Sequence, residues 1–333
     1  MSAEEPTVHA AVSNGIPAPE IPLPFPDRPE IITSNLLALT DLAPDPRTRL
    51  IFRNLITKMH EFITETSITT EEWMSAIQFL TRTGQTCTPL RQEVILLSDV
   101  LGVSALVDAL NNPAVGSATE SSVLGPFYTE DALDVEQGES IASEGKGEYM
   151  FVEGRVLATD GTPISNAAIE TWETDANGYY DTQYSDRAAP DCRGRVHSDA
   201  DGRFAYRAVV PVAYPIPGDG PVGDLLLLLR RHNIRPNHLH LMIDAPGYRK
   251  LTTAVYPEGD PYLSSDVVFG VKKSLVVKLT DVNDEAEARK RGFAKGSTFK
   301  LLNFDIVLVT EEEAEAAAKQ RAQEAAHIAG ARL

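Results

Sequence analysis

The chain has 333 residues, of which 43% are hydrophobic and 23% are charged, and its net charge is -18. This composition is typical of a globular protein with one large domain or two domains of about 100–200 residues each. An acidic chain repels phosphate backbones and anionic lipid, which argues against nucleic-acid and membrane partners.

The first 30 residues are rich in proline and lack periodicity, so we expect a flexible arm over residues 1–30. This segment is acidic and therefore differs from a secretory signal peptide, which is basic and then apolar. The longest apolar run, Leu225 to Leu229, is far shorter than the roughly 20 residues of a membrane-spanning helix. We expect a cytoplasmic protein.

Residues 31–112 carry helical patterns. Asp45-Pro46 is typical of an N-cap followed by a first-turn proline, and apolar residues follow it at helical spacing. Thr69 and Glu72 fit a capping box at the start of a second helix. A third helix is expected to open at Thr88-Pro89. The sequence therefore predicts a helical domain over residues 31–112.

The pattern changes at residue 113, where short β-rich segments alternate with turn dipeptides such as Asp160-Gly161 and Asn177-Gly178. This alternation predicts an antiparallel β-sandwich over residues 113–310. The expected strands are Met150 to Leu157, Ala168 to Thr174, Phe204 to Val210, His238 to Ile243, Leu251 to Val255, Ser274 to Leu279 and Phe299 to Val309. The predicted fold class is α+β, with the helical segment before the sandwich.

The last segment, residues 311–333, is rich in alanine and glutamate and predicts a solvated helical tail. Thr310 and Glu313 fit a capping box at its start. The chain stops at Ala331-Arg332-Leu333, a small-basic-leucine variant of the peroxisomal tripeptide. A peroxisomal location is therefore the alternative to the cytoplasm.

One motif has the spacing of a metal site. In a strand, residues i and i+2 project from the same face, so His238 and His240 can direct two imidazoles at one ion. Imidazole suits zinc, copper, iron and nickel alike, and two exposed histidines on a sheet are the alternative. Leu239 should face the core. His232 lies in a different local element, where we expect a structural role.

Two histidines need further ligands to hold a metal ion. Cys87 and Cys192 are not near the histidine pair, whereas several tyrosines are candidates. Tyr179-Tyr180 follows the Asn177-Gly178 turn, and Tyr214 lies between prolines. Phenolate is a hard anionic donor that suits a hard ion such as Fe(III). Taken alone, Tyr214 is more often a packing residue.

Several ordered motifs together resemble the intradiol ring-cleavage dioxygenases. They are Leu124-Gly125-Pro126-Phe127, Gly154-Arg155-Val156, Gly178-Tyr179-Tyr180, Arg235-Pro236-Asn237-His238-Leu239-His240, Tyr248 to Thr253 and Gly259-Asp260-Pro261-Tyr262. With weaker similarity over the helices, the resemblance covers about residues 35–310. It implies ring cleavage of a small aromatic diol by O2.

The resemblance also implies a cofactor and roles for particular residues. Tyr180, Tyr214, His238 and His240 would bind non-haem iron, Fe(3+). Tyr179 should point the other way, because neighbours in a strand face opposite sides. Tyr214 would leave the metal when the diol binds and accept a substrate proton. Arg235 would stabilise developing negative charge beside the ring, with a surface salt bridge as its alternative role.

The choice of diol is the finest point that the resemblance addresses. The helical N-terminus and the motifs around Gly125 and Tyr214 are most similar to the hydroxyquinol branch, with catechol as the alternative. The residues expected to contact substrate are Leu96, Asp99, Val123, Gly125, Pro126, Phe127, Ile216, Pro217, Arg235 and Ala254. Asp99 would hydrogen-bond a third ring hydroxyl, or else make an interhelical contact. Ala254 replaces the glutamine or histidine of many relatives, which leaves the polarity of the pocket open.

Two other classes of protein fit parts of the pattern. A β-sandwich binding module would need no tyrosine ligands. A zinc or copper hydrolase would need a third histidine or a carboxylate near His238 and His240. Members of the resembled family are commonly homodimers whose helical segments meet around a bound lipid. We therefore expect residues 31–112 to serve dimerisation, and the alternative is that they fold back on the sandwich.

Overall fold

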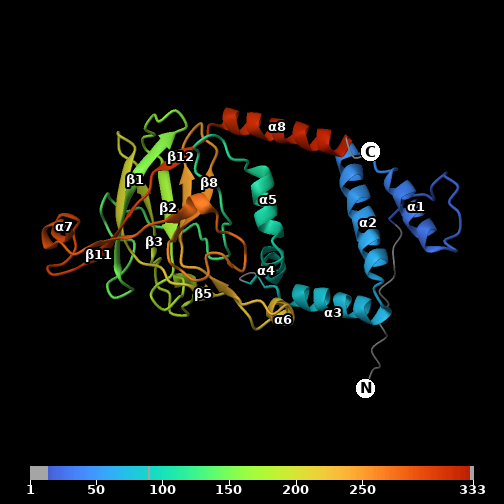
Figure 1. The fold of residues 1–333 in the computed structure, drawn as a ribbon, viewed down its shortest axis with the longest axis horizontal. Coiled ribbons are helices and arrows are strands. Elements are labelled where there is room, and N and C mark those ends of the chain that lie inside the picture. Colours follow the sequence, from blue (N-terminus) through green and yellow to red (C-terminus); the bar gives the residue numbers. More distant parts are fainter. Residues whose placement is uncertain (1–13, 89–90, 331–333) are drawn as a thin grey trace, which may run out of the picture. The chain divides into compact units, whose positions relative to one another are not determined.

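The structure is a computed structural model that describes residues 14–88 and 91–330 (Figure 1). The chain divides into two compact units, Met1–Gln78 and Phe79–Leu333. The C-terminal tripeptide and residues 1–13 of the proline-rich arm lie outside the described residues. Among the described residues, no helix has the length and apolar content to span a bilayer.

The first unit contains α1 (Pro29–Thr40), α2 (Pro46–Thr66) and the start of α3 (Thr70–Thr86). The predicted caps are confirmed: the Asp45 carboxylate accepts from the Thr48 N–H, and Thr69 and Glu72 exchange hydrogen bonds at the start of α3. These bonds satisfy N–H groups that have no partner within the helix. Local sequence thus sets where both helices begin.

The second unit contains two five-stranded sheets, a two-stranded sheet and several helices. Its helices are α4 (Glu93–Val100), α5 (Val103–Asn111), α6 (Pro221–Leu228), α7 (Glu285–Lys290) and α8 (Glu311–Gly330), with 3-10 turns at Asp181–Gln183 and Lys273–Leu275. Its strands are β1 (Tyr149–Ala158), β2 (Ala168–Trp172), β3 (Arg193–His197), β4 (Arg203–Val209), β5 (Tyr214–Pro215), β6 (Ile234–Arg235), β7 (Leu239–Asp244), β8 (Leu251–Pro257), β9 (Val276–Val277), β10 (Thr280–Val282), β11 (Phe299–Asn303) and β12 (Ile306–Leu308).

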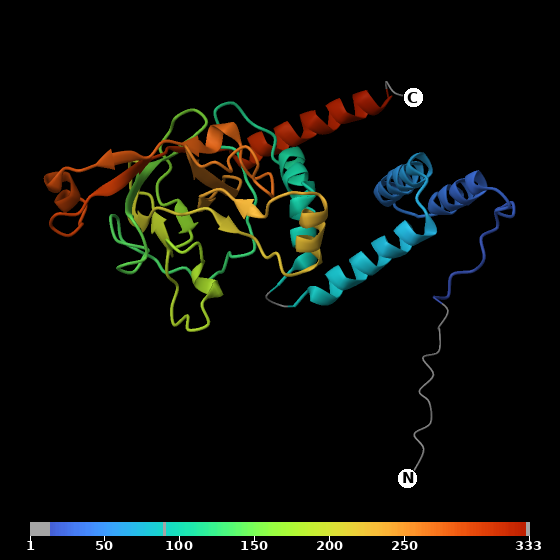
Figure 2. The ribbon, with the colours of Figure 1, turned by 60° about the horizontal axis from the view of Figure 1, so that its bottom comes forward.

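Two five-stranded sheets pack face to face. One has the order β10-β11-β1-β12 with β4 also paired to β1, and the other has the order β3-β2-β7-β8-β9. Side chains from both sheets form one core, including Val152 and Phe204 from the first sheet and Ile169, Leu241 and Val255 from the second. Figures 1 and 2 show α4 and α5 beside one end of this sandwich and α7 at the opposite end.

The sandwich is confirmed, but it is not purely antiparallel. β1 pairs in parallel with β11 and then with β12, and β8 pairs in parallel with β9. The sequence segment Phe299 to Val309 is two strands, because the chain leaves β11 after Asn303 and re-joins β1 further along. Likewise α4 begins at Glu93, later than the expected opening at Thr88.

Candidate functional site

Four donor atoms from three segments of the sandwich converge in the interior of the protein. The Tyr180 hydroxyl lies 3.2 Å from His238 Nε2 and 3.5 Å from the Tyr214 hydroxyl, and His238 Nε2 lies 3.1 Å from His240 Nε2. All four side chains are at most 3% exposed. We call Tyr180, Tyr214, His238 and His240 the ligand cluster.

Tyr180 enters the cluster from a tight turn after β2. Gly178 has a φ of +80°, and a Cβ there would lie 3.3 Å from the Tyr214 Cβ, so glycine suits both the backbone and the space. The Tyr180 N–H donates to the Gln183 side chain. Tyr179 is 51% exposed, so the expectation that only Tyr180 faces inward is confirmed. The two tyrosines lie in an irregular segment that follows the turn, however, rather than in a strand.

Tyr214 and Arg235 arrive together on a small ribbon. They are cross-strand partners in the antiparallel pair β5 and β6, which places their side chains next to each other. Tyr214 also packs edge-on against the Tyr180 ring, with ring centroids 5.5 Å apart. This short ribbon brings a phenol and a guanidinium to the cluster from two strands that are separated in the sequence by α6.

The two histidines present their Nε2 atoms for different local reasons. His238 lies just before β7, and its Nδ1 lies 2.7 Å from the Pro236 carbonyl. The carbonyl accepts a hydrogen bond from the Nδ1–H, so the lone pair of the neutral imidazole is on Nε2. His240 is held by Trp172, its cross-strand neighbour, whose ring stacks on the imidazole at 4.7 Å and 8°. The Leu239 and Leu241 side chains between and beyond them lie in the core, as predicted.

The electrostatics favour a bound cation. Burial, with Arg235 as a second cause, holds the pKa of both histidines well below the usual value, so the imidazoles are neutral donors. Burial, reinforced by Tyr214, raises the pKa of Tyr180 well above its usual value. A phenolate at Tyr180 therefore requires a compensating positive charge such as a metal ion.

The separations of the donor atoms also fit one ion. Two donors bonded to an ion at about 2.0–2.1 Å and separated by about 90–120° lie about 2.8–3.6 Å apart. The three separations in the ligand cluster are 3.1, 3.2 and 3.5 Å. Among the residues that the structure describes, no group of three histidines, cysteines or carboxylates could hold a metal. The tyrosines are therefore needed to complete the ligand set.

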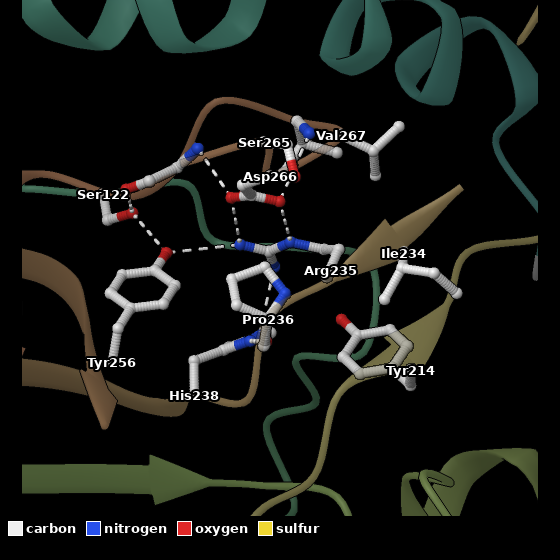
Figure 3. A network of polar contacts seen from close by, with 12 residues as sticks. Ser122, Tyr214, Ile234, Arg235, Pro236, His238, Tyr256, Ser265, Asp266 and Val267 are labelled. Atoms are coloured by element: carbon white, nitrogen blue, oxygen red, sulfur yellow. Dashed lines mark hydrogen bonds and ion pairs between the residues drawn. The ribbon is translucent and has the colours of Figure 1, made fainter. Parts of the chain in front are cut away.

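Arg235 lies beside His238 and Tyr214 of the ligand cluster (Figure 3). Its Nη1 is 3.1 Å from His238 Nε2, and its side chain is only 3% exposed. Burial alone would lower the pKa of Arg235, but Asp266 and two tyrosines outweigh it and raise the pKa, so the group stays cationic. The predicted alternative of a surface salt bridge is therefore wrong: the ion pair with Asp266 is buried.

Several of the expected pocket residues lie close to the ligand cluster or to Arg235. Leu96, Val123, Phe127 and Ile216 belong to or pack on one apolar cluster that also contains Tyr180 and Tyr214. The Gly125 backbone passes His240, since a Cβ there would lie 3.5 Å from Nε2. Asp99 is close enough to Arg235 to interact electrostatically, and burial raises the pKa of its carboxyl.

The remaining expected pocket residues lie less deeply or elsewhere. Pro126 and Pro217 are exposed. Ala254 is fully buried directly opposite His240 in β8, but it packs with Tyr256 and Leu275 rather than in the apolar cluster of the pocket. His232 bonds to Ser265, in keeping with the structural role expected of it.

Comparison with known proteins decides the family. The family description "Dioxygenase" matches residues 123–310, and "Catechol dioxygenase N terminus" matches residues 45–119. The intradiol ring-cleavage dioxygenase hqdA of Aspergillus niger is 44% identical over 88% of this chain and 88% of its own length. The chain belongs to the intradiol dioxygenases.

Other members of the family agree in sequence and in fold. Hydroxyquinol 1,2-dioxygenase of Rhizobium is 47% identical to this dioxygenase, over 79% of this chain and 90% of its own. The solved hydroxyquinol 1,2-dioxygenase of Pseudomonas putida superposes with a TM-score of 0.79 at 44% identity, covering 85% of this chain and 99% of its own. Catechol 1,2-dioxygenase of Acinetobacter radioresistens gives a TM-score of 0.73 at 30% identity, covering 86% and 94%.

Sequence reasoning missed the residues that hold the site of this dioxygenase in place. Val268 packs in the apolar cluster of the pocket, Trp172 stacks on His240, and Asp266 pairs with Arg235. Arg193 donates to Asp181, next to Tyr180, and to the Phe127 carbonyl. Most of these contacts join distant parts of the chain, and no local pattern marks them.

Proposed function

We propose that this dioxygenase cleaves hydroxyquinol with O2 between its two adjacent hydroxyl-bearing carbons, giving 3-hydroxy-cis,cis-muconate or its keto form, maleylacetate. The reaction would take place at Fe(3+) held by Tyr180, Tyr214, His238 and His240. The observation that carries the proposal is the convergence of two phenols and two neutral imidazoles, whose donor atoms follow one another at 3.5, 3.2 and 3.1 Å from Tyr214 through Tyr180 and His238 to His240. The family uses non-haem iron.

The protein's own side chains account for the remaining requirements. Bound iron would supply Lewis acidity and a template for the adjacent hydroxyls. Two phenolates and two neutral imidazoles leave a ferric site with a charge of about +1, which suits an anionic diol. When the diol binds, the Tyr214 oxygen would accept one of its protons. The Arg235 guanidinium would then stabilise negative charge that develops beside the ring.

Hydroxyquinol is favoured over catechol by two observations. Several relatives at 40–47% identity are named for hydroxyquinol or chlorohydroxyquinol, whereas a catechol 1,2-dioxygenase is 36% identical. Asp99 offers a carboxyl near Arg235, where it would accept a hydrogen bond from a third ring hydroxyl. Catechol, giving cis,cis-muconate, is the second candidate, because solved catechol dioxygenases share the fold.

Turnover of hydroxyquinol, catechol and chlorocatechols tests the substrate directly. We expect the highest kcat/KM with hydroxyquinol, and a clear preference for catechol would reverse the order. The ligand set is tested by matched pairs of variants. Tyr180→Phe and His240→Ala should abolish ring cleavage, whereas Tyr179→Phe and His232→Ala should leave it near the parent level. Full activity in either of the first two would remove that residue from the ligand set.

We further infer a homodimer formed through the helical segment. In the first unit, α2 exposes Leu50, Leu55 and Phe62, each more than half exposed. An apolar helix face of this kind favours burial against another surface. Light scattering should give twice the mass of one chain, and mass spectrometry of an extract should show any co-purified lipid. A monomer at micromolar concentration would contradict the dimer.

A further inference from the structure

The guanidinium of Arg235 is enclosed by residues that are remote from it in sequence (Figure 3). Asp266 provides two acceptors: Oδ1 lies 3.3 Å from Arg235 Nε, and Oδ2 lies 3.4 Å from Nη2. The pair is almost completely buried, with side chains 3% and 2% exposed. A planar guanidinium that meets both oxygens of one carboxylate is fixed in orientation as well as in position.

Asp266 is itself fixed by the loop that carries it. Its Oδ1 accepts from the Val268 N–H at 3.3 Å, and its Oδ2 accepts from the Gly270 N–H at 2.9 Å. Each carboxylate oxygen therefore serves one backbone N–H and one nitrogen of Arg235. Both oxygens therefore act as acceptors in all four contacts, and the carboxylate side chain offers enough lone pairs for them.

A second acceptor for Arg235 Nη2 is the hydroxyl of Tyr256, which belongs to β8. The Tyr256 hydroxyl lies 3.2 Å from Arg235 Nη2 and 3.2 Å from the Ser122 hydroxyl, which donates to the Gly270 carbonyl at 2.8 Å. Nη2 is thus held from two sides, whereas Nη1 remains directed at the ligand cluster, 3.1 Å from His238 Nε2.

Gly270 leaves the space in which these groups meet. A Cβ on this residue would lie 2.8 Å from the Tyr256 hydroxyl, 2.9 Å from Arg235 Nη2 and 3.1 Å from Asp266 Oδ2. Such contacts are too close for any side chain, so the three polar groups need glycine at this point. An alanine here would push on the network without removing a single hydrogen-bonding group.

We propose that Asp266, supported by Tyr256 and Gly270, is a positioning residue that fixes the Arg235 guanidinium beside the ligand cluster and balances its charge. The proposal rests on the proposed function, in which Arg235 stabilises charge on the reacting diol. Without Asp266, an unbalanced buried cation would face a ferric site that is itself positive. The guanidinium would then move away from the position at which it assists the reaction.

The test compares Asp266→Asn with the parent holoenzyme. An asparagine keeps the shape of the side chain but makes one of its two terminal atoms a donor. In either orientation of the amide, that donor faces both a backbone N–H and a nitrogen of Arg235. Asp305→Asn is the matched control, because it breaks an Arg–Asp pair at the surface of the same sandwich. Removing a side chain that holds a residue of the metal site in place, without binding the metal itself, typically costs about 10–100-fold in activity.

We expect Asp266→Asn to retain bound iron and its visible charge-transfer band, and to lose about 10–100-fold in kcat with a smaller change in KM. Its crystal structure should show the Arg235 guanidinium displaced or in several positions. Gly270→Ala should produce the same displacement, and it serves as the second variant if Asp266→Asn does not fold. Asp305→Asn should behave as the parent does.

An Arg235 side chain that keeps its place in both variants, with kcat unchanged, would overturn the inference. A uniform loss of iron and stability, with no displacement of Arg235, would also overturn it, since that pattern indicates a merely structural residue. The structural readout is independent of turnover. If the parent enzyme fails to cleave any diol, the proposed function is wrong, but the position of Arg235 in the variants still decides whether Asp266 fixes it.

Discussion

Replacing Arg193 with methionine would remove one guanidinium from the junction between the Tyr180 turn and the pocket wall. Arg193 donates to Asp181 through Nε at 2.9 Å, to the Thr129 hydroxyl at 2.8 Å and to the Phe127 carbonyl at 3.0 Å. The Phe127 ring in turn stacks on Tyr180, with ring centroids 4.5 Å apart. A single buried cation therefore links a proposed iron ligand to a residue that we expect to contact the substrate.

The magnitude follows from burial. The side chains of Arg193 and Asp181 are 2% and 4% exposed. Although burial favours a raised pKa for Asp181, its arginine partners lower that pKa, so the carboxylate is ionised and needs a cation. Breaking a buried pair by removing one partner costs about 3–5 kcal/mol. Arg187 still bonds to Asp181, so we expect about 3 kcal/mol, near the lower end of that range.

Denaturation of the second unit can be followed through Trp172 in a Trp73→Phe background, since the chain has two tryptophans. The matched control is Arg203→Met, which breaks an ion pair whose side chains are 65% and 67% exposed. Such a surface pair contributes less than about 1 kcal/mol. Equal losses of stability in Arg193→Met and Arg203→Met would refute the reasoning. We also expect KM for the diol to rise only in Arg193→Met.

Three further outcomes are expected. Asp99→Ala should lower kcat/KM about 10–100-fold more for hydroxyquinol than for catechol, because this is the cost of one lost hydrogen bond to a charged group. Equal losses with both substrates would show that Asp99 does not determine substrate preference. In the iron-free protein, burial holds the pKa of His238 and His240 well below 6.5, so only the unfolded chain gains their protons as pH falls. The free energy of unfolding should therefore drop by up to about 2.7 kcal/mol per pH unit below about pH 6.5, measured by denaturant titration, and a flat profile would contradict this. Burial raises the pKa of Glu173 well above 4.5. Above pH 4.5 the carboxyl therefore ionises in the unfolded chain before it ionises in the folded protein. This difference lowers the free energy of unfolding of the parent as pH rises. Glu173→Gln cannot ionise, so its stability relative to the parent should increase by about 1.4 kcal/mol per pH unit between pH 5 and 7, and a constant difference would count against a buried neutral carboxyl.

What the sequence predicted well was local. The helix starts at Asp45 and Thr69 follow from side chains within one turn of each other, and the structure confirms both. The spacing of His238 and His240 also works locally, because alternate residues near a strand face one side. The capping box of Thr310 with Glu313 was found for the same reason.

What the sequence did not show depends on pairing between distant segments. The parallel pairing of β1 with both β11 and β12 joins residues about 150 positions apart, and alternation within each strand says nothing about the partner. The sequence did not predict β3, because Arg193–His197 is basic and contains glycine, which are not typical of a buried strand. In the structure its two arginines donate to the buried carboxylates of Asp181 and Glu170. Asp266 could not be matched to Arg235 from the sequence, since many aspartates are equally plausible partners.

Iron content and the visible spectrum of the purified protein test the central claim most directly. We predict about one iron per chain and a red-purple tyrosinate-to-iron charge-transfer band. In Tyr180→Phe this band should weaken or disappear, and in Tyr179→Phe it should be unchanged. A colourless protein that carries zinc instead of iron, or a band that is the same in Tyr180→Phe as in the parent, would contradict the assignment of two tyrosines and two histidines to one ferric ion.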